Sequence, residues 1–536
     1  MKAGIPPALL GALAALAAGP SPALGENLAN APAPPAVSLP GAAVAATAGA
    51  DLRTWIVGAG PGAGAIARDH GARRIAPRTW LVPRERARVL ATSLRARGLL
   101  DYAEPNRLGR LGQTPMPDPL SQFAGWRDYV VLDQVPPPVT RESPLIGVVD
   151  TQIDVRHPEI AGSNIGTTSG VAVRDFHGTA TSTVAAAPAN GVGMLGIWPG
   201  ARVLATPVPN GLSISCSDST RAIAQALRAE AAVINMSYGS PTKCIAEEQQ
   251  VLRAVQAGAV PVAAAGNELA RGNPLEYPAG LAHVLTVGAV GPDDRPTGFS
   301  NESGAVDLSA PGTGILTAVP GSFDPDPTDD GFAFVDGTSF ASPMVAAAVA
   351  WIRQARPRLT PFQAAQVVRL GARDVGEPGY DSASGFGVLN MPGALSRAAP
   401  RDDPLEPNDD VRYVDGRAFG KPARPLYRGR ARTIAAVADF AEDPVDVYRV
   451  KLRPGQRLRL SLVPTTGDAD LFVFGPRARS VRDSRSLRSS SRRGTAPERI
   501  SIRNRAGRTR TFYVAVGFDA DKRVELYNAS YRLRVG

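Results

Sequence analysis

The stretch AAVINMSYGSPTKCIAEEQQVLRAVQAGAVPVAAAGNE, residues 231–268, contains two short apolar runs separated by a stretch of helical period. The same alternation extends from residue 145 to residue 390, with further apolar runs at Leu145–Val149, Val203–Pro207 and Val284–Val290. Short strands that alternate with helices form a parallel sheet covered by helices on both faces. The sequence therefore predicts an α/β domain with a doubly wound, mostly parallel sheet.

Four polar residues follow these apolar runs or open helical stretches. Asp150 follows the run at 146–149, and Asn267 follows the run at 260–264. His177 opens the helix-compatible HGTATSTVAA, and Ser339 lies at the start of GTSFASPMVAA (337–347). Each residue alone could be a turn former or a helix cap. Together they are the set that acyl transfer needs, because a serine needs a base, the base needs an anion and the oxyanion needs donors.

The order Asp–His–Ser, and five motifs in sequence, resemble the subtilisin-like serine proteases over residues 113–395. The motifs are HGT (177–179), INMSYG (234–239), AAGN (264–267), GTSFASPMVAA (337–347) and GFGVLN (385–390). The resemblance implies that Ser339 is the nucleophile, His177 its general base and Asp150 the group that orients His177. It also implies that Asn267 and the backbone N–H of Ser339 bind the oxyanion, and that the chemistry needs no cofactor.

The resemblance further implies where a protein or peptide substrate binds. An extended substrate would pair with the backbone of residues 237–239 as an added strand. The primary specificity pocket would lie between that segment and residues 264–268, with Glu276 near its base and Glu268 at its rim. This predicts a preference for Arg or Lys before the scissile bond. The alternative is that both glutamates are solvated and the pocket accepts large apolar side chains. The predicted substrate-binding residues are Ser237, Tyr238, Gly239, Ala265, Gly266, Glu268 and Glu276.

The sequence departs from the family pattern at three positions. Gln152 stands where the family usually has Gly, and Met344 and Ala347 stand where His or Gly are common. Gln152 is expected to crowd the turn that holds Asp150. A competing hypothesis is therefore a degenerate protease scaffold that acts as a cell-surface or polysaccharide-binding protein through its C-terminal domain. A peptide ligase that uses the same acyl-enzyme also stays open.

The net charge of +10 is unevenly distributed along the 536 residues. Residues 1–112 carry a net +7, residues 113–400 a net −9 and residues 401–536 a net +12. With the composition, this divides the chain into a signal peptide (1–25), an Ala/Pro-rich spacer (26–50) and three further segments, 51–112, 113–400 and 401–536. The resemblance implies that 51–112 is an inhibitory propeptide and 113–400 the peptidase domain, followed by a C-terminal domain (401–536). The apolar run at 5–18 is too short to cross a membrane, so we expect export and no transmembrane segment.

The predicted propeptide has β/α alternation. Strands are expected at 55–57, 80–82 and 99–106, and a helix at 84–96. This pattern resembles the small α+β prodomains of the family, which implies a self-processed zymogen inhibited by its own propeptide. Opposite net charges on the two segments favour their association. Arg107 and Arg110 lie where self-cleavage is expected.

The C-terminal segment contains period-2 apolar runs at 445–452, 458–463, 468–474, 510–517 and 530–535, which predict an all-β sandwich. It resembles bacterial pre-peptidase C-terminal domains. The stretch Arg477–Arg499 holds eight arginines and is expected to be a long exposed loop. It either binds an anionic cell-wall or polysaccharide surface or only increases solubility. A nucleic-acid partner is not expected, because the stretch has no aromatic residues to stack on bases.

Two features bear on structural bonds and ions. Cys216 and Cys244 are the only cysteines, and in an exported chain they are expected to pair, with two buried thiols as the alternative. Structural calcium is implied by the resemblance; candidate ligands are Asp154, the loop Asp324–Asp330 and EPNDD (406–410), which could equally be solvated. His283 lies beside an apolar strand and is expected to fill a core or edge position.

Overall fold

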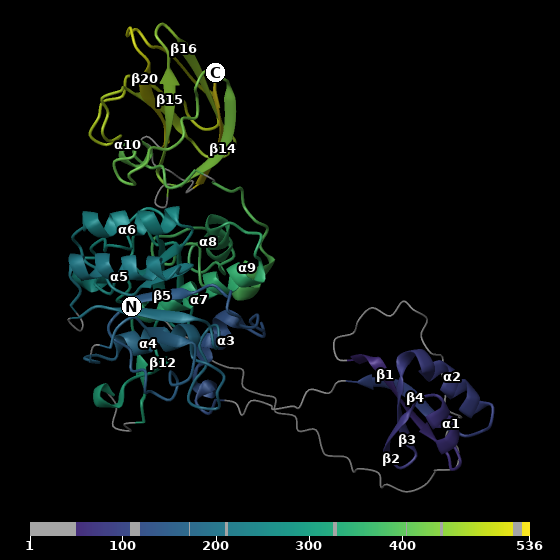
Figure 1. The fold of residues 1–536 in the computed structure, drawn as a ribbon. Helices are drawn as coiled ribbons and strands as arrows, with labels where there is room; N and C mark the ends of the chain where they lie inside the picture. The colour runs from purple at the N-terminus through teal and green to yellow at the C-terminus, as the bar shows by residue number, and fades with distance from the viewer. Residues whose placement is uncertain are drawn as a thin grey trace, which may run out of the picture. The chain divides into compact units, whose positions relative to one another are not determined.

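The computed structural model describes residues 50–107, 118–170, 172–209, 213–324, 330–403, 405–439, 443–517 and 528–536. The chain divides into two compact units, Met1–Gln113 and Thr114–Gly536 (Figure 1). The predicted signal peptide, nearly all of the spacer, and Arg110 lie outside the described residues.

The first unit is a four-stranded antiparallel sheet with two helices. Its elements are β1 (Ala50–Ala59), α1 (Gly64–Asp69), β2 (Arg73–Ala76), β3 (Thr79–Pro83), α2 (Arg84–Arg95) and β4 (Leu100–Arg107), and the strand order is β2-β3-β1-β4. Leu90 and Leu94 of α2 pack with Val57 of β1 in a small core. The predicted strands overlap β1, β3 and β4, and the predicted helix overlaps α2, with a difference of one residue at the start of β4 and at the end of α2. Neither α1 nor β2 was predicted, because all four residues of β2 are exposed and carry no apolar alternation.

The second unit begins with an α/β domain. Its central sheet has seven strands in the order β11-β10-β9-β8-β5-β7-β6, and every pairing is parallel. The strands are β5 (Ile146–Asp150), β6 (Ile165–Thr167), β7 (Val203–Pro207), β8 (Val233–Met236), β9 (Val260–Ala264), β10 (Leu285–Val290) and β11 (Leu308–Pro311). A separate antiparallel pair is β12 (Ile315–Ala318) and β13 (Phe332–Val335). The predicted doubly wound parallel sheet is thus confirmed.

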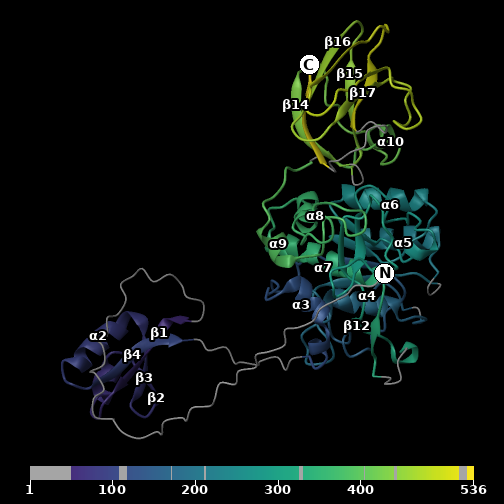
Figure 2. The same ribbon diagram turned by 180° about the vertical axis from the view of Figure 1, so that it is seen from behind.

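Helices cover both faces of this sheet, as Figures 1 and 2 show from opposite sides. One face carries α5 (Cys216–Arg228) and α6 (Ile245–Gln256), and the other carries α4 (His177–Ala186) and α7 (Thr338–Ala355). Nearly all of α7 is buried, since its small side chains let it lie close against the sheet. The other helices are α3 (Gly125–Val131), α8 (Pro361–Leu370) and α9 (Met391–Ser396), and short 3-10 turns lie at Ser121–Phe123, Leu269–Arg271 and Gly321–Phe323.

The C-terminal region is a sandwich of two four-stranded antiparallel sheets, β14-β21-β16-β19 and β15-β20-β17-β18. After α10 (Val411–Val414), its strands are β14 (Arg432–Asp439), β15 (Val445–Leu452), β16 (Arg457–Pro464), β17 (Asp470–Phe474), β18 (Arg488–Ser490), β19 (Glu498–Arg503), β20 (Arg510–Gly517) and β21 (Asn528–Val535). Leu460, Val514 and Leu533 belong to one core that both sheets share. The prediction of a sandwich is confirmed.

The stretch Arg477–Arg499 differs from its prediction in one respect. All eight of its arginines are exposed, as expected, but the stretch contains β18 and the first residues of β19 and is not a continuous loop. Glu498 is fully buried and accepts a hydrogen bond from the backbone N–H of Arg492 at 2.6 Å, which ties the segment to the sheet. These short strands could not be predicted from the sequence, because the Arg- and Ser-rich stretch shows no alternation of apolar and polar residues there.

A disulfide joins Cys216, the first residue of α5, to Cys244, which precedes α6. The predicted pairing is therefore confirmed, and the bond ties together two helices on the same face of the sheet. No helix in the described part of the chain combines the length and the apolar character needed to span a bilayer.

Candidate active site

The carboxyl end of β5 and the start of α4 bring Asp150 and His177 together. Asp150 is the last residue of β5, and His177 is the first residue of α4. The Nδ1 atom of His177 lies 2.7 Å from Oδ1 of Asp150. Asp150 is buried, and its carboxylate also accepts hydrogen bonds from the backbone N–H of Thr151 (2.7 Å) and the hydroxyl of Thr181 (2.9 Å). These bonds fix the carboxylate in one orientation toward the imidazole.

The effects of burial and of Asp150 on the pKa of His177 oppose each other, and the effect of Asp150 is the larger. Burial alone would lower the pKa of the imidazole, but the charge of Asp150 and the hydrogen bond to it outweigh burial and raise the pKa above its usual range. This is the behaviour required of a base that must hold a proton while an intermediate forms.

Gly178 allows the helix to start this close to β5. A Cβ atom on residue 178 would lie only 2.2 Å from the carbonyl oxygen of Thr151. The backbone N–H of Gly178 instead donates to the hydroxyl of Thr151 at 2.8 Å. Any side chain at this position would push His177 away from Asp150. This steric limit explains why a glycine follows the histidine in the HGT motif.

Ser339 is the second residue of α7, and its neighbour Phe340 packs against the imidazole of His177 with ring centroids 5.5 Å apart. The Ser339 hydroxyl donates to the carbonyl oxygen of Ser237 at 3.2 Å. In return, the Ser237 hydroxyl donates to the carbonyl oxygen of Ser339 at 2.7 Å. These two bonds fasten the start of α7 to the segment that follows β8.

Asn267, in the loop after β9, is oriented by α7. Its Oδ1 accepts from the backbone N–H of Thr338 (3.0 Å) and from the hydroxyl of Thr338 (2.9 Å). With Oδ1 engaged in this way, the side-chain NH₂ is the part of the amide left to donate to a ligand. Asn267 is exposed, so a substrate carbonyl can approach it.

Gln152 does not crowd Asp150, contrary to the expectation from the sequence. Its side chain is directed toward the segment that follows β6: Nε2 donates to the carbonyl of Ser169 at 2.8 Å, and Oε1 accepts from the hydroxyl of Thr167 at 3.0 Å. Because both ends of the amide have partners, the longer side chain is accommodated without disturbing the turn.

Glu276 lies between the two segments predicted to line the specificity pocket. A Cβ on Gly239 would be 2.7 Å from its Oε2, and a Cβ on Gly266 would be 2.8 Å from its Cγ. Glu276 is 5% exposed and its Oε2 has no hydrogen-bond partner. Burial, with the charge of Glu268 as a second cause, raises the pKa of Glu276. Glu268 itself is half-buried and accepts from the backbone N–H of Asn267.

The remaining predicted substrate-binding residues fall on the same rim. Ser237, Tyr238 and Gly239 follow β8, and they line a cavity of about 440 Å³ together with Asp150 and His177. Ala265 and Gly266 follow β9, the strand next to β8 in the sheet. The structure thus brings the predicted residues together along the carboxyl ends of β5, β8 and β9.

Some residues at the site were not predicted. Thr181 lies four residues after His177 on the same face of α4, a spacing that could have identified it. Asp175 accepts from the backbone N–H of His177 at 2.7 Å and so fixes the start of α4. Thr338 orients Asn267, and no sequence pattern links these two residues.

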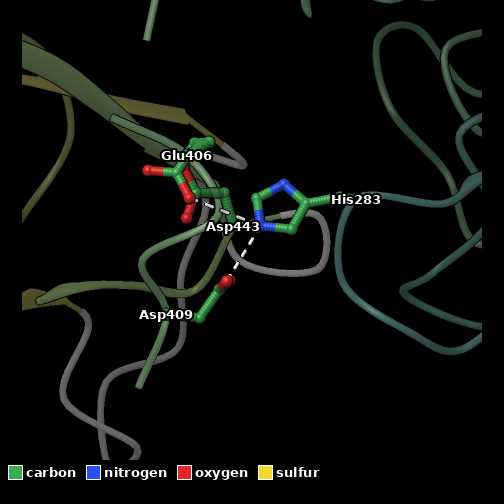
Figure 3. Close-up of side chains that lie close together, drawn as sticks. All are labelled: His283, Glu406, Asp409 and Asp443. Atoms are coloured by element: carbon green, nitrogen blue, oxygen red, sulfur yellow. Dashed lines mark hydrogen bonds and ion pairs between the residues drawn. The ribbon is translucent and has the colours of Figure 1, made fainter. Parts of the chain in front are cut away.

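The structure places the three groups of candidate calcium ligands in different surroundings. Asp154 accepts from the backbone N–H of Arg156 at 3.0 Å and belongs to no group of three ligands among the described residues. Residues 325–329 of the acidic loop lie outside the described residues. Asp324 and Asp330 accept from the backbone N–H groups of Gly331 and Phe332. In EPNDD, Glu406 and Asp409 are buried beside His283 (Figure 3), so the expectation that His283 fills a plain core or edge position was incomplete.

Comparison with known proteins matches residues 141–387 to the model of the subtilase family. Subtilisin Savinase of Lederbergia lenta is 33% identical over 222 residues, which are 41% of this chain and 77% of Savinase. Subtilisin E of Bacillus subtilis (strain 168) is 32% identical over 257 residues, 46% of this chain and 65% of that protein. Fervidolysin of Fervidobacterium pennivorans is 28% identical over 366 residues, 62% of this chain and 50% of fervidolysin.

The chain thus spans about half of fervidolysin and somewhat under two thirds of subtilisin E. It matches more than two thirds of Savinase at 33% identity. The chain belongs to the subtilase family of subtilisin-like serine proteases.

Proposed function

We propose that the chain is a secreted serine endopeptidase that hydrolyses peptide bonds through an acyl-enzyme, with Asp150, His177 and Ser339 as its triad. The observation that carries the proposal is the 2.7 Å bond from His177 to a buried carboxylate beside the start of α7. Intact Asp, His, Ser and Asn residues argue against the degenerate scaffold, and the accommodated Gln152 removes the main reason to consider it.

In the proposed mechanism the Ser339 hydroxyl first turns from the carbonyl of Ser237 toward Nε2 of His177. Its oxygen attacks the substrate carbonyl carbon while the proton passes to Nε2, and Asp150 stabilises the resulting imidazolium. The side-chain NH₂ of Asn267 and the backbone N–H of Ser339 donate to the oxyanion. His177 then gives the proton to the leaving amine. Water next attacks the acyl carbon while His177 takes its proton, and His177 returns a proton to the Ser339 oxygen as the C–O bond to the acyl group breaks and the carboxylic acid is released.

The proposed substrate is an extended peptide. Backbone groups of residues 237–239 lie beside the cavity that contains Asp150 and His177, so a peptide added there as a strand would present its carbonyl to Ser339. The main chain supplies affinity in this mode, and side-chain pockets supply specificity.

We propose that residues 51–112 form an inhibitory propeptide which the enzyme removes itself. Support comes from the separate compact unit, which ends at Gln113, and from the opposite net charges of the two segments. β4, the last strand of this unit, ends at Arg107, and Arg110 comes three residues later in the sequence.

The processed chain is expected to begin shortly after Arg107 or Arg110. Self-cleavage after either residue would leave the first unit folded, because the cut falls beyond its last strand. N-terminal sequencing of the enzyme purified after full processing measures this directly. A start far upstream of Arg107 would reject the proposed boundary, and a full-length active enzyme would reject the zymogen.

We propose that Glu276 selects Arg or Lys before the scissile bond. Its carboxylate is held between Gly239 and Gly266, and Oε2 has no protein partner, so a guanidinium or ammonium group in the pocket would supply the missing counter-charge. Because the pKa of Glu276 is raised, this preference should weaken as the pH falls through that pKa and the carboxylate is neutralised.

A cleavage-site profile on a mixed peptide library tests both the activity and the pocket. The wild-type enzyme is expected to cleave after Arg and Lys in preference to Phe. Glu276→Gln keeps the size of the side chain but removes the charge, and it should reduce the Arg/Phe ratio of kcat/KM by about 10-fold or more, the effect of roughly one charge-assisted hydrogen bond.

The exposed Glu377 provides a matched control, and Glu377→Gln should leave the Arg/Phe ratio unchanged. An unchanged ratio in Glu276→Gln would refute the role of Glu276 but leave the peptidase proposal intact. Absence of any cleavage by the processed wild type would instead refute the peptidase proposal.

A further inference from the structure

The outer face of one sheet of the C-terminal sandwich carries arginines without opposing charges. In the sheet β14-β21-β16-β19 (Figure 1), β16 pairs with β19 on one side and with β21 on the other. Along these three strands the buried residues, most of them apolar, alternate with exposed or half-buried ones, so every second side chain points outward. Six outward residues are exposed arginines, which we call the arginine face: Arg457, Arg459, Arg499, Arg503, Arg532 and Arg534.

The register of the strands places like charges side by side. Arg457 lies directly opposite Arg503, and Ser461 lies between Arg499 on β19 and Arg534 on β21. The other outward positions on these strands, as far as the structure describes them, hold serine or valine and no carboxylate. Like charges directly opposite in an antiparallel pair are destabilising, so this arrangement lowers the stability of the free sandwich.

A pocket with the same charge adjoins the arginine face. It has a volume of about 510 Å³ and lies between the connection from β17 to β18 and the turn from β19 to β20. None of the described residues that line it is a carboxylate, and five of them are arginines: Arg477, Arg485, Arg503, Arg505 and Arg510. Arg503 belongs to both the pocket and the arginine face, so the positive charge is continuous between them.

None of these ten arginines is neutralised by a carboxylate in the described part of the chain. The arginines of the C-terminal region that form ion pairs there are Arg412 and Arg417, and neither belongs to the pocket or to the arginine face. The stretch Arg477–Arg499 supplies three of the ten, and the strands and the turn around it supply the others, so folding gathers this charge. A surface that only keeps a protein soluble needs no such segregation, because interspersed charges of both signs serve that purpose.

The arginine face forms a band that leads away from the pocket. It begins at Arg503, continues through Arg459 and ends at Arg532, which lies opposite Val463. From residue 457 to residue 463, β16 advances about 20 Å, because each residue of an antiparallel strand adds about 3.4 Å. A band of this length with a pocket at one end matches a linear chain of anionic groups.

We propose that the pocket and the arginine face bind a linear acidic polysaccharide, whose carboxylate or sulfate groups are held by the guanidinium groups. Guanidinium binds oxygen anions of this kind through paired hydrogen bonds, and it stays charged throughout the physiological pH range. The polymer supplies the negative charge that this side of the sandwich lacks. The arginine-rich stretch is then one part of a folded binding surface and does not act as an independent loop.

Two other classes of polyanion fit these observations less well. A single-stranded nucleic acid is held largely by stacking of its bases on aromatic rings. No described outward residue of these three strands is aromatic, and Phe512, which lines the pocket, is only 7% exposed. A membrane surface is planar and cannot follow the charge into a pocket, so it would leave the pocket arginines without partners.

The test measures binding of two acidic polysaccharides, heparin and polygalacturonate, to the full-length chain carrying Ser339→Ala, which prevents self-digestion. Titration calorimetry is expected to show micromolar binding of at least one of them, no binding of neutral dextran, and weaker binding as the salt concentration rises. The combined variant Arg477→Gln/Arg485→Gln/Arg505→Gln should raise the Kd by about 10-fold or more, because it removes three charged contacts. All three residues are exposed, so the fold should be retained, which the melting temperature checks.

A matched control removes the same charge from the α/β domain. The combined variant Arg228→Gln/Arg253→Gln/Arg358→Gln also replaces three exposed arginines, and it should leave the Kd unchanged. A further variant, Arg459→Gln/Arg534→Gln, leaves the pocket intact and tests the arginine face, so it should raise the Kd as well.

Four outcomes would contradict the proposal. Failure of both acidic polysaccharides to bind would leave the arginines with a role in solubility alone. Equal weakening in the α/β-domain control would show a response to net charge and not to this surface. A Kd unaffected by the arginine-face variant would show that the band is not part of the site. Tighter binding of oligothymidylate or of phosphatidylglycerol vesicles at the same salt concentration, lost in the pocket variant, would identify a nucleic acid or a membrane as the partner instead.

Discussion

Replacing Ser339 with alanine is expected to lower kcat for peptide hydrolysis by about 10⁶-fold, the magnitude known for loss of the nucleophilic serine in subtilisin. The substitution removes the only oxygen at the start of α7 that the proposed mechanism uses as nucleophile. Asn267, which Thr338 orients independently of Ser339, keeps its position. The residual rate should therefore be the small contribution of substrate binding and oxyanion stabilisation, measured with purified protein and a fluorogenic peptide.

The same variant separates loss of chemistry from loss of structure. The Ser339 hydroxyl makes one hydrogen bond, to the carbonyl of Ser237, so its removal should cost about 1 kcal/mol of stability. A fluorophosphonate should label the wild type and fail to label the variant. Ser396→Ala is the matched control: its hydroxyl also donates to a backbone carbonyl, in α9 and away from the site, and the variant should keep full activity. Comparable hydrolysis by Ser339→Ala would reject Ser339 as the nucleophile.

Most of the active site could be predicted from the sequence, because in a parallel sheet the order of the strands determines which residues lie side by side at its carboxyl edge. Asp150 ends a strand, and Ser237 and Asn267 each follow one. Neighbouring parallel strands end at the same edge of the sheet, so the proximity of these residues could be inferred from the order of the strands. The partners that fix each side chain could not be inferred in this way. The bond from Thr338 to Asn267 joins residues 71 apart, and no periodicity connects a helix start with a loop after another strand.

The errors have physical causes as well. Gln152 was expected to crowd Asp150 because only its size was considered, whereas its amide finds two partners near β6. The apolar neighbours of His283 in the sequence favour a core or edge position for it. Its partners are more than 120 residues away in the C-terminal segment, and only the docking of the sandwich brings Asp409 to within 2.9 Å. When the residues of a cluster come from two domains, neither domain's sequence alone contains a motif that would reveal the contact.

Replacing Asp150 with alanine is expected to lower kcat by about 10⁴-fold, again on the scale known for subtilisin. In the proposed mechanism the wild-type carboxylate accepts the Nδ1 proton of His177, with Nδ1 and Oδ1 2.7 Å apart, and so leaves Nε2 free to accept the proton of Ser339. Without it, the imidazole loses both its fixed orientation and the charge that stabilises its protonated form. Thr181 and Thr151 would keep their hydroxyl and N–H groups but would lose the acceptor that connects them to His177.

The pH profile gives this substitution a signature that a general loss of structure would not produce. Burial lowers the pKa of His177 and Asp150 raises it, so removing Asp150 leaves burial as the main effect and moves that pKa downward. Because the base must be neutral, the acid limb of kcat/KM should shift to lower pH in Asp150→Ala. The fold loss should therefore be largest above the wild-type pKa and smaller at acid pH, where the wild type is already protonated. Asp150→Asn separates the two contributions: the N–H of Thr151 favours the amide oxygen on the side of His177, so orientation is retained while the charge is lost. An acid limb that stays in place in both variants would show that Asp150 does not control the protonation of His177.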